Sequence, residues 1–496
     1  MRARSLLLAV AASVALLIVS TVSAGSVLPT PISDDPYTNV GPQHRTQVEP
    51  DSYAFGNTIV ALTQSGRYYS GGGASNLVFS TSTDSGRHWT TGGLPGTTVN
   101  EGGPWPRISD PSIAYDAQDD VWLALGLGID AGSTGHILLV NRSTDGGLTW
   151  SNPVTAAESP GSFWDKTWIT CDNWPASPHF GNCYIQYDNN SAGNLMQMVT
   201  STDGGVTWGP IRTPSGSPSG LGGQPVVQPN GTVIVPYSAN YGAIEAFRST
   251  DGGASWSSEV FVSDQSTHGV NGSMRDPPLP SAEVDEAGKV YVVWHDCRFR
   301  TGCSANDIVM STSSDGVTWS ATVRIPIDAV DSGRDHFLPG IAVDTATSGS
   351  TGHLALGYYY YPVSSCSGDA CDLTNGFVSS IDGGATWTTG QRIGGPFHPS
   401  WIANTNQGRM VGDYMSTSFT GDGNAHPVFS LAKAPDTGTC YPPTANNVCR
   451  QRMASATFDI DPAPTATSVH VQRQKAADRR RARVYRNKVT GYPRTR

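Results

Sequence analysis

Ser-Thr-Asp-Ser-Gly-Arg-His-Trp occupies residues 82–89, and its pattern, Ser-x-Asp-x-Gly-x-x-Trp, returns along the chain. Further copies lie at Ser143–Trp150, Ser201–Trp208, Ser249–Trp256 and Ser380–Trp387, and a copy shorter by one residue lies at Ser313–Trp319. The six aspartates follow one another at intervals of 48 to 67 residues. Repetition at such a period indicates stacked supersecondary units, and units of short strands are typical of β-propellers.

The repeated phrase has the chemistry of a tight turn. Its Asp side chain can accept backbone N–H bonds, and its Gly permits a positive φ. Short β-rich runs such as Leu77-Val78-Phe79 and Ile308-Val309-Met310 precede several copies. We therefore predict a turn between the third and fourth strands of each unit. The Trp is expected to pack between neighbouring units, and the Asp residues of the phrase to be structural rather than catalytic.

The number of units follows from the same spacing. Short apolar runs separated by turn residues, with little helical periodicity, predict an all-β fold. Seven sets of strands can be identified, the first over roughly 52–80 and the last, which lacks the phrase, over roughly 400–433. Seven units in residues 47–460 average about 59 residues, close to the observed intervals, whereas six would average about 69. We expect seven four-stranded blades, with six as the alternative if the first and last sets share one blade.

The chain start has the features of a secretory signal. Arg2 and Arg4 precede an apolar run from Leu6 to Val19, and small residues at Val22-Ser23-Ala24 suit a cleavage site. The expected organisation is a signal peptide at 1–24, a linker at 25–46, the propeller at 47–460 and a basic disordered tail at 461–496.

The eight cysteines fit an exported protein. They form four pairs of near neighbours, whose short loops suit disulfides in an oxidising compartment: Cys171/Cys183, Cys297/Cys303, Cys366/Cys371 and Cys440/Cys449. Pairing of neighbours is an inference, because eight cysteines allow 105 connectivities. No Cys/His quartet at zinc-ligand spacing appears. A Ca²⁺ site at Asp422 is a weaker possibility, since Thr-Gly-Asp-Gly-Asn is also ordinary turn composition. We expect neither a metal nor a cofactor.

Charge is unevenly distributed. Ten Lys/Arg and one Asp follow Val471, so this tail carries +9, whereas the whole chain carries −10. An acidic body argues against nucleic acid as a ligand. Contact of the tail with an anionic cell-wall polymer is an open alternative to a purely solvated extension. We expect a monomer.

Polar residues are expected to gather on the face opposite the Ser-x-Asp turns, around the channel mouth. First strands begin there and second strands end there. Arginines could bind a carboxylate or sulfate, and aspartates could act as acid or base. The candidate catalytic acids are Asp110 and Asp335. The candidate substrate-binding residues are Arg107, Arg275, Arg334, Asp165, Asp296 and Arg298. Acids at turns between first and second strands, such as Glu286 and Asp344, are assigned to the other face as turn residues.

The repeated phrase resembles the Asp-box, or bacterial neuraminidase repeat, of secreted bacterial sialidase-like propellers. Sialidases bind the substrate carboxylate with three arginines and use an Asp acid/base and a Tyr nucleophile activated by Glu. The resemblance implies Arg107, Arg275 and Arg334 as that triad, Asp110 as the acid/base and Tyr414 as the nucleophile. The chain lacks the Phe-Arg-Ile-Pro segment before the first Asp-box, and Glu is scarce around the expected mouth.

The sequence leaves two main functions open. One is a secreted glycan-active hydrolase that acts on an acidic sugar or polysaccharide. The alternative is a non-catalytic propeller that binds carbohydrate or protein at the cell surface, where exposed Trp or Tyr rings would stack on sugars. A structural cell-surface protein anchored by its tail is a third possibility.

Overall fold

The chain is built almost entirely from antiparallel β-strands, which confirms the all-β prediction. The computed structural model describes residues 28–436, 440 and 448–460. The predicted signal peptide and the basic tail from 461 on lie outside the described residues. Helix is limited to short 3₁₀ turns, and no helix in the described part is long and apolar enough to cross a membrane. These turns are η1 (Val99–Glu101), η2 (Asn190–Ala192), η3 (Thr301–Cys303), η4 (Gly349–Thr351), η5 (Gly368–Ala370) and η6 (Pro399–Trp401).

The strands form successive antiparallel sets, which we call sheets 1 to 7. One backbone β-pair, Ala74–Ile108, connects sheets 1 and 2. Sheet 1 holds β2 (Gln43–Phe55), β3 (Thr58–Arg67), β4 (Ala74–Ser82) and β5 (Thr90–Gly93). Sheet 2 holds β6 (Arg107–Asp116), β7 (Val121–Ile129), β8 (Gly135–Ser143) and β9 (Val154–Glu158). Sheet 3 holds β10 (Trp164–Cys171), β11 (Cys183–Asn189) and β12 (Leu195–Ser201).

The later sheets repeat this order. Sheet 4 holds β13 (Val226–Val227), β14 (Val233–Ala239), β15 (Ala243–Ser249) and β16 (Val260–Asp264). Sheet 5 holds β17 (Ser281–Val284), β18 (Val290–Asp296), β19 (Asp307–Ser313) and β20 (Val323–Arg324). Sheet 6 holds β21 (His336–Val343), β22 (Leu354–Tyr360), β23 (Leu373–Ser380) and β24 (Gln391–Phe397). A separate hairpin, β25 (Ala403–Thr405) and β26 (Gly408–Met410), precedes sheet 7.

Sheet 7 joins the two ends of the described chain. It contains β27 (Ser416–Phe419), β28 (Asn424–Ala432), β29 (Gln451–Ser455) and, as its outer strand, β1 (Thr30–Pro31); β30 (Phe458–Asp459) also pairs with β28. Thr30 pairs with Ser455, and the Ile32 N–H donates to the Met453 carbonyl at 3.0 Å. Part of the segment expected as a linker therefore lies on the body. Because the third and fourth strands of sheet 7 come from opposite ends of the chain, no turn joins them, which explains why this unit lacks an Asp-box.

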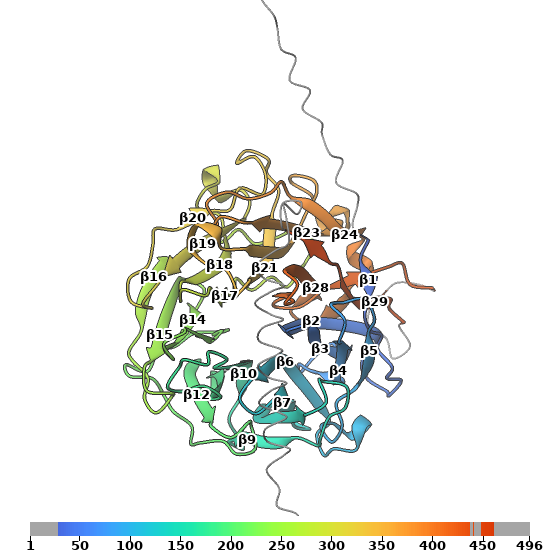
Figure 1. Cartoon of the computed structure of the whole chain (residues 1–496). Coiled ribbons are helices and arrows are strands. Elements are labelled where there is room, and N and C mark those ends of the chain that lie inside the picture. The colour runs from blue at the N-terminus through green and yellow to red at the C-terminus, as the bar shows by residue number, and fades with distance from the viewer. Residues whose placement is uncertain (1–27, 437–439, 441–447, 461–496) are drawn as a thin grey trace, which may run out of the picture.

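The sheets are arranged in a ring with their first strands innermost (Figure 1). The first strands contact one another in cyclic order, from β2 through β6, β10, β13, β17, β21 and β27 back to β2. Separate hydrophobic clusters lie between successive sheets, such as the one that joins Leu123 and Leu125 of sheet 2 to Ile169 and Ile185 of sheet 3. A cluster of Ile32, Ala61, Val428 and Met453 fills the junction between sheets 7 and 1.

The Asp-box turns have the predicted structure. In the second copy the Ser143 hydroxyl donates to Asp145 at 2.8 Å and accepts the Gly147 N–H at 2.9 Å. The Asp145 carboxylate also accepts the Thr149 N–H at 2.9 Å. In the shortened copy, backbone N–H bonds from Thr318 and Val317 lower the pKa of Asp315 to about 2. These carboxylates are thus occupied by their own turns.

The Asp-box tryptophans pack against the preceding sheet. Trp150 of sheet 2 lies 5.9 Å from Phe79 of sheet 1, and Trp256 of sheet 4 lies 6.2 Å from Tyr184 of sheet 3, measured between ring centroids. Trp89 of sheet 1 packs against the cluster that closes the ring. The expected packing between neighbouring units is therefore present.

The four disulfides join near neighbours in the sequence, as expected. The pairs are Cys171–Cys183, Cys297–Cys303, Cys366–Cys371 and Cys440–Cys449.

We predict that Ile32→Ala destabilises the chain by loosening the junction between sheets 7 and 1. Ile32 is 4% exposed. Loss of a buried Ile side chain typically lowers the free energy of unfolding by about 2–5 kcal/mol. Urea denaturation measures this change. Leu28→Ala is the control, because Leu28 is 80% exposed. Equal stability of the two variants would show that the β1 segment does not help to close the ring.

Candidate active site

The candidate site is built on β-bulges in the first strands of sheets 1, 2 and 3. The register of strand pairing shifts at Glu49, Asp110 and Lys166, and their φ angles are +53°, +49° and +53°. A bulge adds a residue and redirects its side chain. Left-handed backbone at a non-glycine residue costs roughly 1–2 kcal/mol, so each position is strained.

The same bulge recurs in sheet 6 with an apolar residue. Leu338 has a φ of +50° at a register shift between Phe337 and Gly340, and it is buried. The strain therefore belongs to the fold. What distinguishes sheets 1 to 3 is that the redirected side chains are ionisable.

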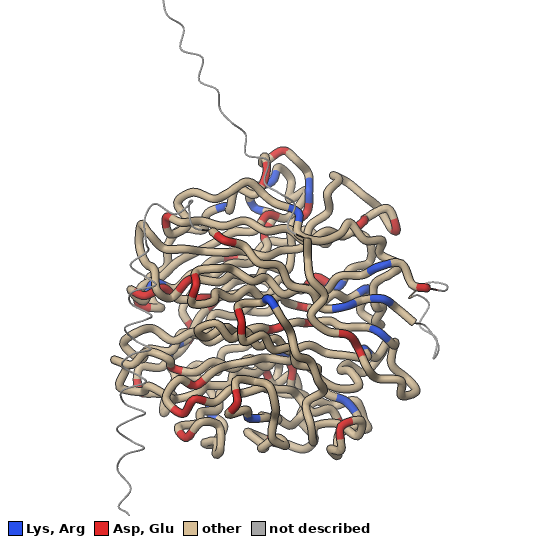
Figure 2. The backbone as a smooth tube through the Cα atoms, turned by 45° about the vertical axis from the view of Figure 1, so that its right-hand side comes forward, with Lys and Arg blue, Asp and Glu red and all other residues tan. Residues whose placement is uncertain are grey.

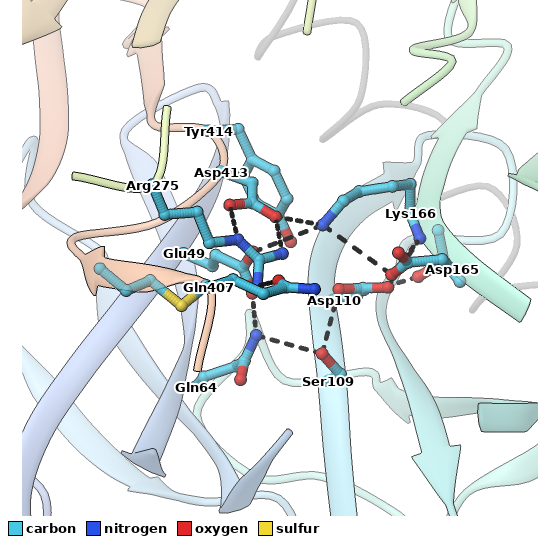
Figure 3. A network of polar contacts seen from close by, with 12 residues as sticks. Glu49, Gln64, Ser109, Asp110, Asp165, Lys166, Arg275, Gln407, Asp413 and Tyr414 are labelled. Atoms are coloured by element: carbon cyan, nitrogen blue, oxygen red, sulfur yellow. Dashed lines mark hydrogen bonds and ion pairs between the residues drawn. The ribbon is translucent and has the colours of Figure 1, made fainter. Parts of the chain in front are cut away.

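Lys166 is the centre of a buried polar network (Figure 3). Its ammonium group forms an ion pair with Asp413 and lies 3.7 Å from Glu49 Oε1 and 3.8 Å from Asp165 Oδ1. Burial alone would lower the pKa of Lys166, but Asp165, Asp413 and Glu49 raise it well above its usual value. Lys166 thus acts as an internal cation for three carboxyl groups.

Arg275 supplies a second cation from the loop before sheet 5. Its Nε donates to Asp413 Oδ1 at 2.5 Å, its Nη2 binds Asp413 Oδ2, and its Nη1 binds Gln407. Burial would raise the pKa of Asp413, but Arg275 and Lys166 outweigh burial and hold the pKa well below its usual range. Asp413 is therefore ionised at neutral pH.

Glu49 and Asp110 are connected by neutral hydrogen-bonding groups. Gln64 Nε2 donates to Glu49 and, at 3.2 Å, to the Ser109 hydroxyl, which donates to Asp110 Oδ1 at 3.0 Å. Asp110 Oδ2 also accepts the Lys166 backbone N–H at 2.8 Å. Both acids are 1% exposed. Burial raises the pKa of Glu49 to about 8 and that of Asp110 to about 6.

Asp188 adds a further buried carboxyl group. It pairs with Asp165 across β10 and β11, so the two side chains project from the same face. It is fully buried. Burial, followed by repulsion from Asp165, raises its pKa well above the usual range. The surroundings of Asp188 therefore favour its protonated form.

The hairpin β25–β26 covers part of the network. Met274 and Arg409 form a parallel bridge, the Arg275 N–H donates to the Arg409 carbonyl at 2.9 Å, and Arg409 donates back to Ser273 at 2.8 Å. A cavity of about 20 Å³ touches Lys166 and Asp413. Asp165, with a side chain 33% exposed, and Tyr241, 44% exposed, provide the solvent-facing edge of the site.

The structure brings Asp110, Asp165, Arg275 and Tyr414 of the predicted site residues together (Figure 3). Tyr414 donates its hydroxyl to the Pro111 carbonyl at 3.2 Å and packs edge-on against Trp168. Burial, then Glu49 and Asp110, raise the pKa of Tyr414 well above its usual value.

The remaining predicted residues have other partners. Arg107 lies over the Tyr68 ring and binds the Ser70 carbonyl at 2.7 Å, whereas Arg334 is exposed. The three predicted arginines therefore do not form one cluster.

The last three predicted site residues, Asp335, Asp296 and Arg298, form hydrogen bonds or ion pairs outside the Lys166 network. Asp335 accepts the Asn306 N–H at 2.8 Å and lies 3.1 Å from His268 Nδ1. Asp296 and Arg298 form a local ion pair at 2.7 Å.

Several network residues were not predicted as site residues. Glu49 could not be assigned to a strand from the sequence, although Glu49-Pro50 and Asp110-Pro111 occupy the same position in their sheets. The acid-Pro pair that both sheets share was the feature of the sequence that could have placed Glu49 beside Asp110. Lys166 directly follows the predicted residue Asp165, and Asp413 directly precedes Tyr414, but nothing in the sequence indicated that one would neutralise the other.

One group elsewhere has metal-ligand side chains. Asp307, Asp328 and His336 offer ligand atoms within 4.8 Å of one another. Arg300 and Arg324 bind the same two carboxylates at 2.5–2.9 Å. Because guanidinium groups already supply the positive charge, we assign this group as an ion-pair cluster.

Comparison with protein families gives one match: residues 180–339 match the BNR repeat-like domain. This segment contains three of the six repeated turns. No curated protein sequence matches the chain.

Solved structures similar to the chain include glycoside-processing enzymes. A Hadza microbial sialidase is 16% identical with a TM-score of 0.43, and the match covers 71% of this chain and 66% of that protein. A leech intramolecular trans-sialidase is 12% identical with a TM-score of 0.46, over 88% and 70%. An alpha-L-arabinofuranosidase of Fusarium graminearum is 13% identical with a TM-score of 0.44, over 88% and 98%.

We predict that Glu49→Gln flattens the pH dependence of stability. The pKa of Glu49 is about 8 in the folded chain against 4.5 as the ordinary value. The folded state therefore keeps a proton that the unfolded state releases, and stability falls as pH rises from about 4.5 to 8. Removing the group reduces this slope by up to about 1.4 kcal/mol per pH unit.

Urea denaturation between pH 5 and 8 measures the slope. Glu158→Gln is the control, because Glu158 is exposed in β9. An unchanged slope in Glu49→Gln would show that Glu49 ionises normally in the folded chain.

Proposed function

We propose that the chain is a secreted glycan-active hydrolase built as a seven-bladed β-propeller, with sheets 1 to 7 as its blades. The cyclic contacts of the first strands support this assignment. So does the central cavity, which is lined by residues from the first strand of each of the seven sheets. The four disulfides suit export to an oxidising compartment.

The observation that carries the proposal is that carboxyl groups beside Lys166 have pKa values shifted in opposite directions. The pKa of Asp110 is raised, and that of Asp413 is lowered. Glycoside hydrolysis needs a protonated acid beside the leaving oxygen and an ionised carboxylate nearby. Environments that separate the pKa values of neighbouring carboxyl groups identify these roles. Asp110, with a pKa raised to about 6, is the proposed general acid. Asp165 is the proposed carboxylate partner because its side chain reaches solvent.

Binding of an acidic sugar would use Arg275. Its side chain is 18% exposed, and its Nη1 is held by Gln407, an exposed residue of the hairpin. A substrate carboxylate offers a stronger, charge-assisted partner than the Gln amide. We propose that such a group displaces Gln407 while Asp413 keeps Arg275 in place. A sialidase-like substrate is therefore compatible with a single arginine at the mouth.

Tyr414 has a different proposed role from the one that the sialidase resemblance implies. A nucleophilic tyrosine needs a base that removes its proton, but this hydroxyl donates to the Pro111 carbonyl and has a raised pKa. We propose that Tyr414 positions the Asp110-Pro111 bulge.

A non-catalytic glycan-binding function is the second candidate. Glu49, Asp110 and Asp413 are each 1% exposed, so a substrate reaches them only if the hairpin moves. Tyr241 is exposed beside the network with a φ of +63°, a strained conformation that presents its ring to solvent. Such a ring can stack on a sugar without any reaction.

We predict that Asp110→Asn lowers kcat/KM at least about 100-fold on a hydrolysed glycoside, since general acid catalysis typically contributes 10²–10⁴-fold. A panel of fluorogenic sialosides, uronides and neutral glycosides provides the substrates. Asp84→Asn is the control, because the Asp84 carboxylate serves its own turn through Ser82 and His88.

Absence of turnover across the panel by folded protein would exclude the hydrolase for these substrates. Glycan-array binding that survives Asp110→Asn but is lost in Tyr241→Ala would then support the binding function.

A further inference from the structure

The central cavity of the ring lies deeper along the axis than the candidate active site and opens toward the opposite face. Trp168, Gln224, Ser281 and Met415 line both this cavity and the small cavity beside Lys166. The volume of the central cavity is about 880 Å³. Its walls are the ends of the first strands, such as Asp51–Phe55 of β2 and Ile341–Val343 of β21, and the turns that follow them. Glu49 lies nearer the start of the same strand β2, so the two sites occupy successive depths along the ring axis.

The described residues that line this cavity include five acids and no Lys or Arg. The acids are Asp51, Glu283, Glu286, Asp344 and Asp422. The network around Lys166 contains two cations, Lys166 and Arg275, whereas the described lining of this cavity has no Lys or Arg. Its histidine, His353, lies 3.8 Å from Asp344 Oδ2. Figure 2 shows that acidic residues are spread over the whole body, but this cavity gathers several of them around one space.

Asp51 and Glu283 lie close enough to repel each other. Asp51 accepts hydrogen bonds from the Ile113 N–H at 2.8 Å and from the Ser112 hydroxyl at 2.9 Å, so its role is structural. Glu283 faces the cavity, where burial and then Asp51 raise its pKa to about 8. A cation that enters the cavity would relieve this repulsion. Tyr53, Trp168 and Trp174 also line this cavity, and guanidinium groups bind favourably to aromatic rings.

The described chain ends beside this cavity. Asp459 in β30 pairs with Asn424, and Gly421, Asp422 and Gly423 just before Asn424 form part of the cavity rim. The next 36 residues, 461–496, contain the ten Lys/Arg that follow Val471. A stretch of about 13 residues between Ile460 and Arg473 spans up to about 45 Å when extended. The basic segment can therefore reach any part of the cavity.

We propose that this acidic cavity binds the chain's own basic segment, residues 472–496. Charge complementarity and the position of the chain end both support this occupant. The segment has a charge of +9, and the described lining of the cavity has carboxyl groups, aromatic rings and no Lys or Arg. This docking does not rest on the proposed hydrolase, because it uses acids of the cavity that have no part in the proposed reaction. An external polyanion would compete with the cavity for the same arginines.

Zero-length carbodiimide cross-linking of the full-length chain tests the proposal. The basic segment contains two lysines, Lys475 and Lys488, that can form amide bonds with carboxylates in contact with them. Mass spectrometry at low salt is expected to find them joined to Glu286, Asp344 or Asp422. These links should be lost in 0.5 M NaCl, because salt screens exposed charges.

A matched pair of triple variants provides the control. The first variant combines Glu286→Gln, Asp344→Asn and Asp422→Asn, which remove three rim charges. It should lower the summed yield of all cross-links from Lys475 and Lys488 at least tenfold. Glu158→Gln, Glu259→Gln and Asp331→Asn change the net charge equally at exposed positions away from the cavity and should leave the links intact. Thermal unfolding verifies that both variants fold.

A mixture of ¹⁴N- and ¹⁵N-labelled protein separates links within one chain from links between copies. Links within one chain to the rim acids support the proposal. Links between copies, links scattered over other acids, or lysines that react only with a soluble amine-reactive probe would each overturn it.

Discussion

The apolar faces of the sheets impose the constraint on which the structure depends. A sheet whose two faces are both apolar must be covered on both sides, and in this chain each cover is the next sheet. The tryptophans of the repeated turns extend that contact by packing on the preceding sheet, as Trp150 does on Phe79. A linear stack would leave two faces exposed to water. Closure through β1 and the cluster around Ile32 removes both exposed faces at once.

The polar network at the mouth exists only because the ring is closed. Its carboxyl, ammonium and guanidinium groups come from sheets 1, 2 and 3, from the residues just before sheet 7 and from the loop before sheet 5. Burying several charges and three strained bulges opposes stability. Leu338 shows that an apolar residue fits the same bulge. The ionisable residues in the other bulges are therefore better explained by chemistry at the mouth than by folding.

The sequence predicted those features that depend on local chemistry. The turn phrase is self-contained, so its hydrogen bonds, its position between strands and the packing of its Trp could be inferred without knowledge of distant residues. The cysteines likewise pair within short loops. Features that depend on distant contacts were not predicted. The two-residue strand β1 has no periodicity to detect, and Arg107 and Arg275 look equivalent until Tyr68 and Asp413 are found as their respective partners. Glu286 and Asp344 were assigned to turns, and the structure shows that these turns also border a large cavity.

The pairing of β1 with β29 also determines the order in which the molecule can assemble. Chains generally fold from the N-terminal end as they emerge, and contacts between residues close in sequence form soonest. In this chain β1, close to the start of the described residues, pairs with β29, close to their end. Sheets 1 to 6 can form while the chain is still being made, but their outermost apolar faces stay exposed until β29 is in place. The partly made protein would therefore depend on being kept from aggregation during that interval, either by rapid completion of the chain or by a chaperone that covers those faces.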